Sequence, residues 1–141
     1  MTPKWVARIL ESEALWLLAR LLLTFMYWYA GIGFLANFNG AQAVMAANGV
    51  QPAALIAALT IACELFGSAL IILDRFTWFG AGVLGVFTLA TIPLVHHFWT
   101  MTGLDAVNAT LESEEHITVI GGLIAISMLS QIRRRWKAAR A

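Results

Sequence analysis

The positive charges of this chain are concentrated at its two ends, and this distribution constrains the fold more than any other feature. Of the nine Lys and Arg residues, seven lie within residues 4–8 and 133–140. The other two are Arg20 and Arg75, and only Arg20 lies inside an apolar stretch. Membrane insertion keeps cationic segments on the cytoplasmic side, which produces this kind of segregation. The sequence therefore predicts an integral membrane protein that crosses the bilayer several times.

The composition agrees with a membrane protein. Hydrophobic residues make up 60% of the chain and charged residues only 12%, whereas a soluble domain carries roughly 25% charged residues. A length of 141 residues indicates one domain, 1–141. The net charge of +1 gives no reason to expect nucleic acid as a partner, and the single cysteine, Cys63, cannot form an internal disulfide. The expected partner of most of the surface is the lipid bilayer.

Four stretches are long and apolar enough to cross a hydrocarbon core of about 30 Å, which takes about 20 residues of helix. They are residues 14–36, 53–73, 78–98 and 113–132. An even number of spans places both termini on one side, and the basic ends indicate that this side is the cytoplasm. We therefore expect outer loops at 37–52 and 99–116 and a basic cytoplasmic tail at 133–141.

Two short helices are also expected outside the spans. Residues 4–13 can form an amphipathic helix that lies along the membrane before the first span. Residues 38–50 can form a short interfacial helix that ends at Asn48-Gly49. Within the third span, Pro93 is expected to bend the helix and so redirect its His96-His97 end.

Glu64 is the most informative single residue, because it lies close to the middle of the second span. A charged side chain there costs at least about 2.5 kcal/mol, so the carboxyl group must be neutral or paired. At a rise of 1.5 Å per residue, Arg20 lies about 9 Å and Glu64 about 13–14 Å from the cytoplasmic ends of their spans. We therefore expect Arg20 and Glu64 to pair or to share a polar network. The alternative is that Arg20 extends toward the inner headgroups and Glu64 stays neutral.

A second polar group gathers at the outer ends of the spans. All three histidines, His96, His97 and His116, lie there, and Glu115 is adjacent to His116. Imidazole and carboxylate groups that lie close together can bind a metal or relay protons. The spacing contains no HExxH or paired-Cys motif, so it does not favour a metal or haem site. A proton-accessible or ligand-facing pocket and ordinary interfacial histidines remain as the two interpretations.

Tyr27 belongs to an aromatic run, residues 27–29, inside the first span. Aromatic rings within a helical bundle can flank a flat quinone-like headgroup, or they can simply pack. The chain contains no phosphate-binding glycine loop and no dinucleotide fingerprint.

The order of several motifs resembles the DoxX family of small bacterial membrane proteins. The motifs are ARLLL at 19–23, YAGIGF at 29–34, NGVQP at 48–52, ELFG at 64–67, the His pair at 96–97 and Gly121-Gly122. The resemblance implies an all-α, antiparallel four-helix bundle in the bacterial inner membrane. It also implies that Arg20 and Glu64 occupy polar positions of the family. Some members are linked to thiosulfate oxidation with a quinone as the electron acceptor, and others to membrane complexes that handle thiol or oxidative stress.

These observations lead to three functional hypotheses. The first is a redox-associated membrane subunit that holds a quinone-like or other small apolar ligand, with Arg20 and Glu64 as its polar anchor. The histidines would then handle protons, and a membrane or periplasmic redox protein would be the partner. The second is a non-catalytic accessory or scaffold subunit of a membrane complex. The third is a small transporter component in which Glu64 titrates. The sequence leaves open whether the protein is itself catalytic.

Overall fold

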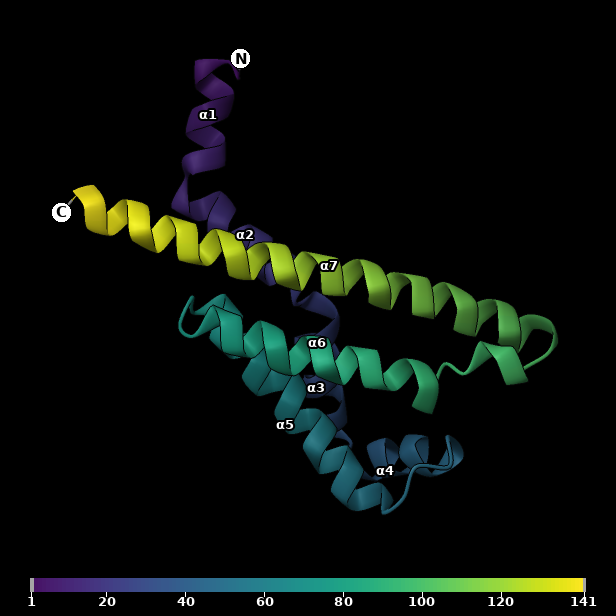
Figure 1. The fold of residues 1–141 in the computed structure, drawn as a ribbon. Helices are drawn as coiled ribbons and strands as arrows, with labels where there is room; N and C mark the ends of the chain where they lie inside the picture. The colour runs from purple at the N-terminus through teal and green to yellow at the C-terminus, as the bar shows by residue number, and fades with distance from the viewer. Residues whose placement is uncertain (1, 141) are drawn as a thin grey trace.

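The chain is helical almost throughout, as predicted. The computed structural model describes residues 2–140, so residues 1 and 141, the two ends of the predicted domain, lie outside the described residues. Seven α-helices and one 3₁₀ helix occur within the described range, and no strand does (Figure 1). In chain order they are α1 (Lys4–Glu11), α2 (Glu13–Leu23), α3 (Phe25–Ala36), α4 (Phe38–Ala47), α5 (Ala53–Ile72), α6 (Thr77–Leu94), η1 (Phe98–Thr100) and α7 (Gly103–Arg140).

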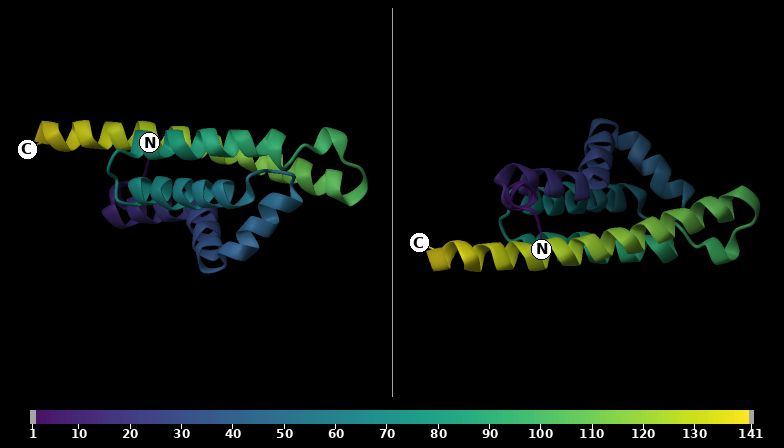
Figure 2. Two further views of the ribbon diagram at one scale, coloured as in Figure 1. Left: turned by 90° about the horizontal axis from the view of Figure 1, so that it is seen from below. Right: turned by 90° about the horizontal axis from the view of Figure 1, so that it is seen from above.

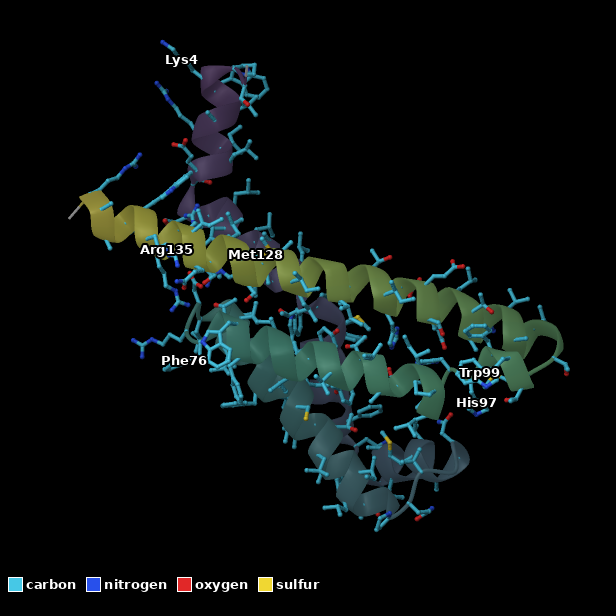
Figure 3. All side chains as sticks on the ribbon, viewed as in Figure 1. Lys4, Phe76, His97, Trp99, Met128 and Arg135 are labelled. Carbon is cyan, nitrogen blue, oxygen red and sulfur yellow. The ribbon has the colours of Figure 1, made fainter. Side chains whose placement is uncertain are left out.

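The first helix is the amphipathic segment that the sequence predicted. None of the residues of α1 is buried, and Trp5, Ile9 and Leu10 are exposed beside Lys4 and Arg8. Helix α1 extends away from the other helices, and Figure 3 shows Lys4 at its far end.

Ser12 separates α1 from α2 because it is both the C-cap of α1 and the N-cap of α2. Its extended backbone ends α1, and its hydroxyl oxygen accepts a hydrogen bond from the Leu15 amide of α2 at 3.2 Å. A serine in this position satisfies one of the amide groups left free at a helix start.

The predicted first span, residues 14–36, is not one straight helix. It is divided at Thr24 into α2 and α3, whose axes are bent by 56°. The Thr24 hydroxyl donates to the Arg20 carbonyl at 2.8 Å, and a hydroxyl bonded to the carbonyl four residues earlier bends a helix. Sequence hydropathy does not detect this bend, because both halves are apolar.

Helices α3 and α4 form a V on the side of α5 that faces away from α7 (Figure 2). Asn37 starts α4 by accepting a hydrogen bond from the Gly40 amide at 2.9 Å. The helix ends where Gly49 adopts a positive φ of 71° and the Val50 amide donates to the Met45 carbonyl at 2.9 Å. This is the C-terminal cap expected at Asn48-Gly49, so the predicted short helix in this segment is confirmed.

Helices α5 and α6 pack closely because both carry a glycine at their contact. A Cβ atom on Gly80 would lie only 2.8 Å from the carbonyl oxygen of Gly67, and one on Gly67 would lie 2.6 Å from Leu84 Cγ. Small residues at this contact let the two backbones approach, as is common between membrane helices.

The last helix is much longer than predicted. Residues 99–116 were expected to form an outer loop, but α7 is continuous over 38 residues from Gly103 to Arg140. At 1.5 Å per residue it is about 57 Å long, well beyond the hydrocarbon thickness of about 30 Å. Helix α6 ends at Leu94, directly after Pro93, so His96 and His97 lie in non-helical chain rather than on the third span.

The helices define two ends of the molecule. We call the end with the α5–α6 turn the Asp74 end and the end with the α6–α7 connection the His116 end. Phe76 and Arg135 lie toward the Asp74 end, and His97 and Trp99 lie at the His116 end (Figure 3).

The contacts between helices differ at the two ends of the molecule. At the Asp74 end, α2 contacts both α5 and α7, while α6 also contacts both of them. Toward the His116 end, the bend at Thr24 directs α3 away, so its backbone contacts α5 and α4 but neither α6 nor α7. Three of the described helices are long and apolar enough to cross a membrane, and the bent pair α2 and α3 would make a fourth span.

Candidate functional site

The divergence of α3 leaves a cavity of about 380 Å³ among α3, α4, α5, α6 and the start of the apolar part of α7. Most of its lining side chains are apolar, including Met26, Phe34, Leu59, Phe87 and Leu94. Four of the predicted site residues also line it, namely Tyr27, Glu64, His96 and His116. Among the described residues, no Lys or Arg lines the cavity. A concave, mainly apolar site with a few polar groups is typical of a small-molecule pocket.

Glu64 is buried in the wall of this cavity without a partner. Its side chain is on α5 and only 6% of the residue is exposed. Its Oε2 atom is enclosed and has no hydrogen-bond partner among residues 2–140. A buried polar atom that lacks a partner destabilises a protein by about 1–3 kcal/mol. A residue retained at this cost is a candidate for binding or chemistry rather than for stability.

Tyr27 and Thr88 form the second polar element of the cavity wall. The Tyr27 hydroxyl lies 2.6 Å from the Thr88 hydroxyl, which in turn donates to the Leu84 carbonyl at 2.7 Å. Because Thr88 has a single hydroxyl proton and uses it on Leu84, Tyr27 must be the donor to Thr88. The Tyr27 oxygen consequently keeps its acceptor capacity. This bond is the link between α3 and α6 where their backbones have separated.

The predicted pair between Arg20 and Glu64 is not formed. Arg20 is 7% exposed, and its guanidinium donates to the carbonyl oxygens of Trp16 at 3.2 Å, Ile71 at 3.4 Å and Ile72 at 2.5 Å. The last two carbonyls are at the C-terminal end of α5, where helix carbonyls lack partners and the helix dipole favours a cation. Arg20 therefore turns toward the Asp74 end, while Glu64 faces the cavity. The prediction was wrong because the two side chains point in different directions, whatever their depths in the membrane.

Asp74 is the polar centre that the sequence reasoning missed as a site. Its Oδ2 accepts a hydrogen bond from the Trp16 indole at 3.0 Å, and its Oδ1 accepts from the Thr77 hydroxyl at 2.9 Å and the Ser130 hydroxyl at 2.6 Å. The guanidinium of Arg134 lies 3.6 Å from Oδ1 and donates to the Asp74 carbonyl at 3.1 Å. One carboxylate thus connects α2, the start of α6 and α7.

The environment of Asp74 favours its charged form. Partial burial on its own raises the pKa of Asp74, but the hydrogen bonds from Ser130, Trp16 and Thr77 and the nearby charge of Arg20 outweigh it. The pKa of Asp74 therefore lies below its ordinary value. An acid in a turn before a polar residue is a common capping pattern, so the Thr77 contact could have been expected from sequence. Trp16 and Ser130 are far from Asp74 in the sequence, so no local sequence pattern indicates their contacts with it.

The predicted histidine cluster is formed by two of the three histidines. His96 Nδ1 lies 2.7 Å from Glu112 Oε2, and the His96 and His116 rings meet edge to face with their centroids 4.8 Å apart. The Ser113 hydroxyl also approaches the His96 carbonyl at 3.4 Å. Because α7 begins at Gly103, Glu112 and His116 lie one turn apart on the same helix and both face the end of α6.

The other two outer residues lie elsewhere. His97 is bonded to the Thr100 hydroxyl at 2.7 Å, outside the cavity lining. Glu115 is exposed on α7 and does not line the cavity. Within residues 2–140, no group of three or more His, Cys, Asp or Glu side chains is arranged to hold a metal ion.

Comparison with known proteins agrees with the sequence motifs. The chain is 28% identical over 113 residues to the inner membrane protein YphA of Escherichia coli strain K12, an alignment that covers 79% of this chain and 80% of that protein. No solved structure matches the chain. The model of the DoxX family matches residues 15–97, a segment that contains most of α2, all of α3 to α6 and most of the residues that line the cavity. On this match over more than half of its length, the chain belongs to the DoxX family.

Proposed function

We propose that this DoxX-family protein is a multi-pass inner-membrane subunit that binds a small, mostly apolar, quinone-like ligand in the cavity beside α3. The observation that carries the proposal is Glu64, a buried acid that lines the cavity and whose Oε2 atom has no hydrogen-bond partner among residues 2–140. The volume of about 380 Å³ falls within the range of roughly 300–1,000 Å³ usual for small-molecule sites. The apolar lining suits a ring or an alkyl chain, and the polar groups suit its oxygen atoms.

The redox association of the proposal comes from the family resemblance. In this role the protein positions the ligand within the membrane, and a membrane or periplasmic partner carries out electron transfer. Arg20 is no longer part of the binding site in this proposal, because it caps α5 at the opposite end of the molecule.

Binding to the purified protein tests the proposal. A short-chain benzoquinone should raise the melting temperature in detergent and should bind in calorimetry. Glu64→Leu removes every hydrogen-bonding group of the side chain, and we expect it to weaken binding by about tenfold, or about 1.4 kcal/mol. The matched control is Glu114→Leu, since Glu114 is exposed on α7. Absence of quinone binding to the unaltered protein would refute the proposal, as would equal affinities for the two variants.

We also propose that both termini face the cytoplasm. The proposal is supported by the basic residues in α1 and at the C-terminal end of α7, whereas residues 37–52 and 99–116 contain no Lys or Arg. A reporter that is active only outside the cytoplasm should be inactive when fused after residue 141 and active when inserted at residues 48–50. The reverse result would refute this orientation.

A further inference from the structure

A second cavity, of about 180 Å³, lies between the junction of α1 with α2 and the C-terminal end of α7. Helix α1 contacts α2 but not α7, and it runs across the direction of α7 rather than along it (Figures 1 and 2). We call this space the α1–α7 cleft. Its lining is mostly charged and consists of Glu11, Glu13, Arg133, Trp136, Lys137 and Arg140. None of these residues lines the cavity beside α3, so the cleft is a separate candidate site.

The cations of the cleft share one face of α7. Arg133, Lys137 and Arg140 are spaced by four and three residues, which places them on the same side of a helix. Arg135, between them in the sequence, does not line the cleft. The basic tail is therefore divided into a face that lines the cleft and a face that does not.

Two of these cations are held in place by protein groups. Glu13 Oε1 accepts a hydrogen bond from Arg133 at 2.8 Å and lies 3.0 Å from the Lys137 ammonium. The guanidinium of Arg133 also lies over the Trp16 ring, 5.1 Å from its centroid. Groups that are already ordered lose less entropy when a ligand binds. Arg133 and Lys137 are therefore prepared to bind an anion.

The charges of the cleft do not cancel. Three cations and two acids line it, which gives a net charge of +1. An arginine carries five N–H donors and a lysine three, and Arg133 and Lys137 share a single oxygen of Glu13. Arg140 forms no ion pair within residues 2–140. A group with one negative charge and several acceptor oxygens, such as a phosphodiester, therefore complements the cleft.

The cleft lies where the apolar surface of α7 gives way to charge. Leu129 and Ile132 are 45% and 41% exposed, and they lie seven and four residues before Trp136, on the same side of the helix. Trp136 is itself exposed, and tryptophan is enriched at the level of the lipid headgroups. A phospholipid can use both this apolar surface and the charged cleft, whereas a soluble anion can use only the cleft.

We propose that the α1–α7 cleft binds the headgroup of an anionic phospholipid, with its phosphodiester on Arg133, Lys137 and Arg140 and its acyl chains along Leu129 and Ile132. The inference does not depend on the ligand of the cavity beside α3. Guanidinium and ammonium groups form strong, charge-assisted hydrogen bonds to phosphate oxygens. A zwitterionic lipid carries the same phosphate but also an ammonium group that the cations of the cleft repel. The cleft should therefore prefer the anionic lipid.

Native mass spectrometry of the full-length protein in a neutral detergent tests this preference. Dioleoyl phosphatidylglycerol is anionic, and dioleoyl phosphatidylethanolamine has the same acyl chains on a zwitterionic headgroup. We expect the unaltered protein to bind the first lipid about fivefold more tightly, the factor that one Lys or Arg contributes beside an anionic lipid. Equal affinities for the two lipids would overturn the inference and would leave the proposed function intact.

Matched substitutions on α7 then separate a bound headgroup from general attraction to a basic tail. Arg140→Gln removes a cation that lines the cleft, and Arg135→Gln removes one that does not. Both residues are exposed, so both variants should fold. Arg140→Gln should weaken phosphatidylglycerol binding by about fivefold, and Lys137→Gln should do the same. Arg135→Gln should have little effect, because salt screens charges that do not touch the phosphate. Equal losses in Arg135→Gln and Arg140→Gln would overturn the assigned site.

A soluble headgroup provides the last comparison. Glycerophosphoglycerol is phosphatidylglycerol without its acyl chains, so it carries the same phosphodiester. At an equal concentration it should displace little of the lipid, because it buries no apolar surface on α7. Full competition by glycerophosphoglycerol would show that the cleft binds a soluble phosphodiester and would refute the assignment to a lipid.

Discussion

Replacement of Asp74 by Asn is expected to destabilise the protein by about 2–4 kcal/mol. The carboxylate accepts hydrogen bonds from Trp16, Thr77 and Ser130, and bonds to a charged group contribute about 1.5–3 kcal/mol each. An asparagine oxygen in place of Oδ1 retains the two hydroxyl bonds, although neutral bonds are roughly half as strong. The NH₂ group would replace Oδ2 and face the Trp16 indole, so two donors would oppose each other. Release of a partly buried charge offsets some of this loss.

Unfolding of the purified protein in mixed micelles measures the effect. The free energy of unfolding of Asp74→Asn should be compared with that of Asp105→Asn, because Asp105 is an exposed acid in the first turn of α7. The control should lose no more than about 1 kcal/mol, the contribution of an acid near a helix N-terminus. Equal losses in the two variants would refute the view that Asp74 connects the helices.

The pH dependence of stability provides a second readout of the same carboxylate. The pKa of Asp74 is lowered in the folded protein, so the contribution of the charged Asp74 to the free energy of unfolding is fully present above the pKa of an unfolded Asp, about 3.9. It is lost as the pH falls through the lower folded pKa, because protonation then removes the charge. The unaltered protein should therefore lose more stability on acidification below about pH 4 than Asp74→Asn does. Parallel acid titrations of the two proteins would contradict this expectation.

Three further substitutions test the packing and the cavity. Gly80→Ala should destabilise the protein by about 1–3 kcal/mol through overpacking. Gly82→Ala should be neutral or stabilising, because there is open space around its Cβ position. Equal melting temperatures of the two variants would contradict the close contact between α5 and α6. Tyr27→Phe should lower the free energy of unfolding by about 0.5–1.5 kcal/mol, because it removes the hydrogen bond to Thr88. Tyr29→Phe, at an exposed position, should lower it by less than half as much in the same unfolding assay. Glu64→Leu should stabilise the unliganded protein by about 1–3 kcal/mol, because it removes an unpartnered buried carboxyl; a fall in melting temperature would show that Glu64 has a structural role instead.

Much of the membrane architecture could be predicted from the sequence. Hydropathy and the placement of Lys and Arg are one-dimensional properties, and they indicate where helices long enough to cross a bilayer begin and end. They located α5 and α6 within a few residues and predicted an all-helical chain. Local turn chemistry also located the end of α4 at Asn48-Gly49. The burial of Glu64 followed from its central position in an apolar stretch.

The polar residues themselves were therefore visible in the sequence, but their partners were not. Glu64, Tyr27, His96 and His116 were all selected from sequence as site residues, and the structure brings them to one cavity. The partner predicted for Glu64 was wrong, because residue depth gives no information about the direction in which a side chain points.

Tertiary structure alone decided three features that create the site. The 56° bend at Thr24 directs α3 away from α6 and opens the cavity, although the residues on both sides of the bend are equally apolar. The extension of α7 to Gly103 places Glu112 and His116 beside His96, in a segment whose polarity suggested a loop. Arg20 binds the end of α5 because free carbonyls are available there. Each of these three features depends on which side chains and carbonyl groups come into contact in the folded protein. The order of polar and apolar residues along the chain indicates only which groups must avoid lipid.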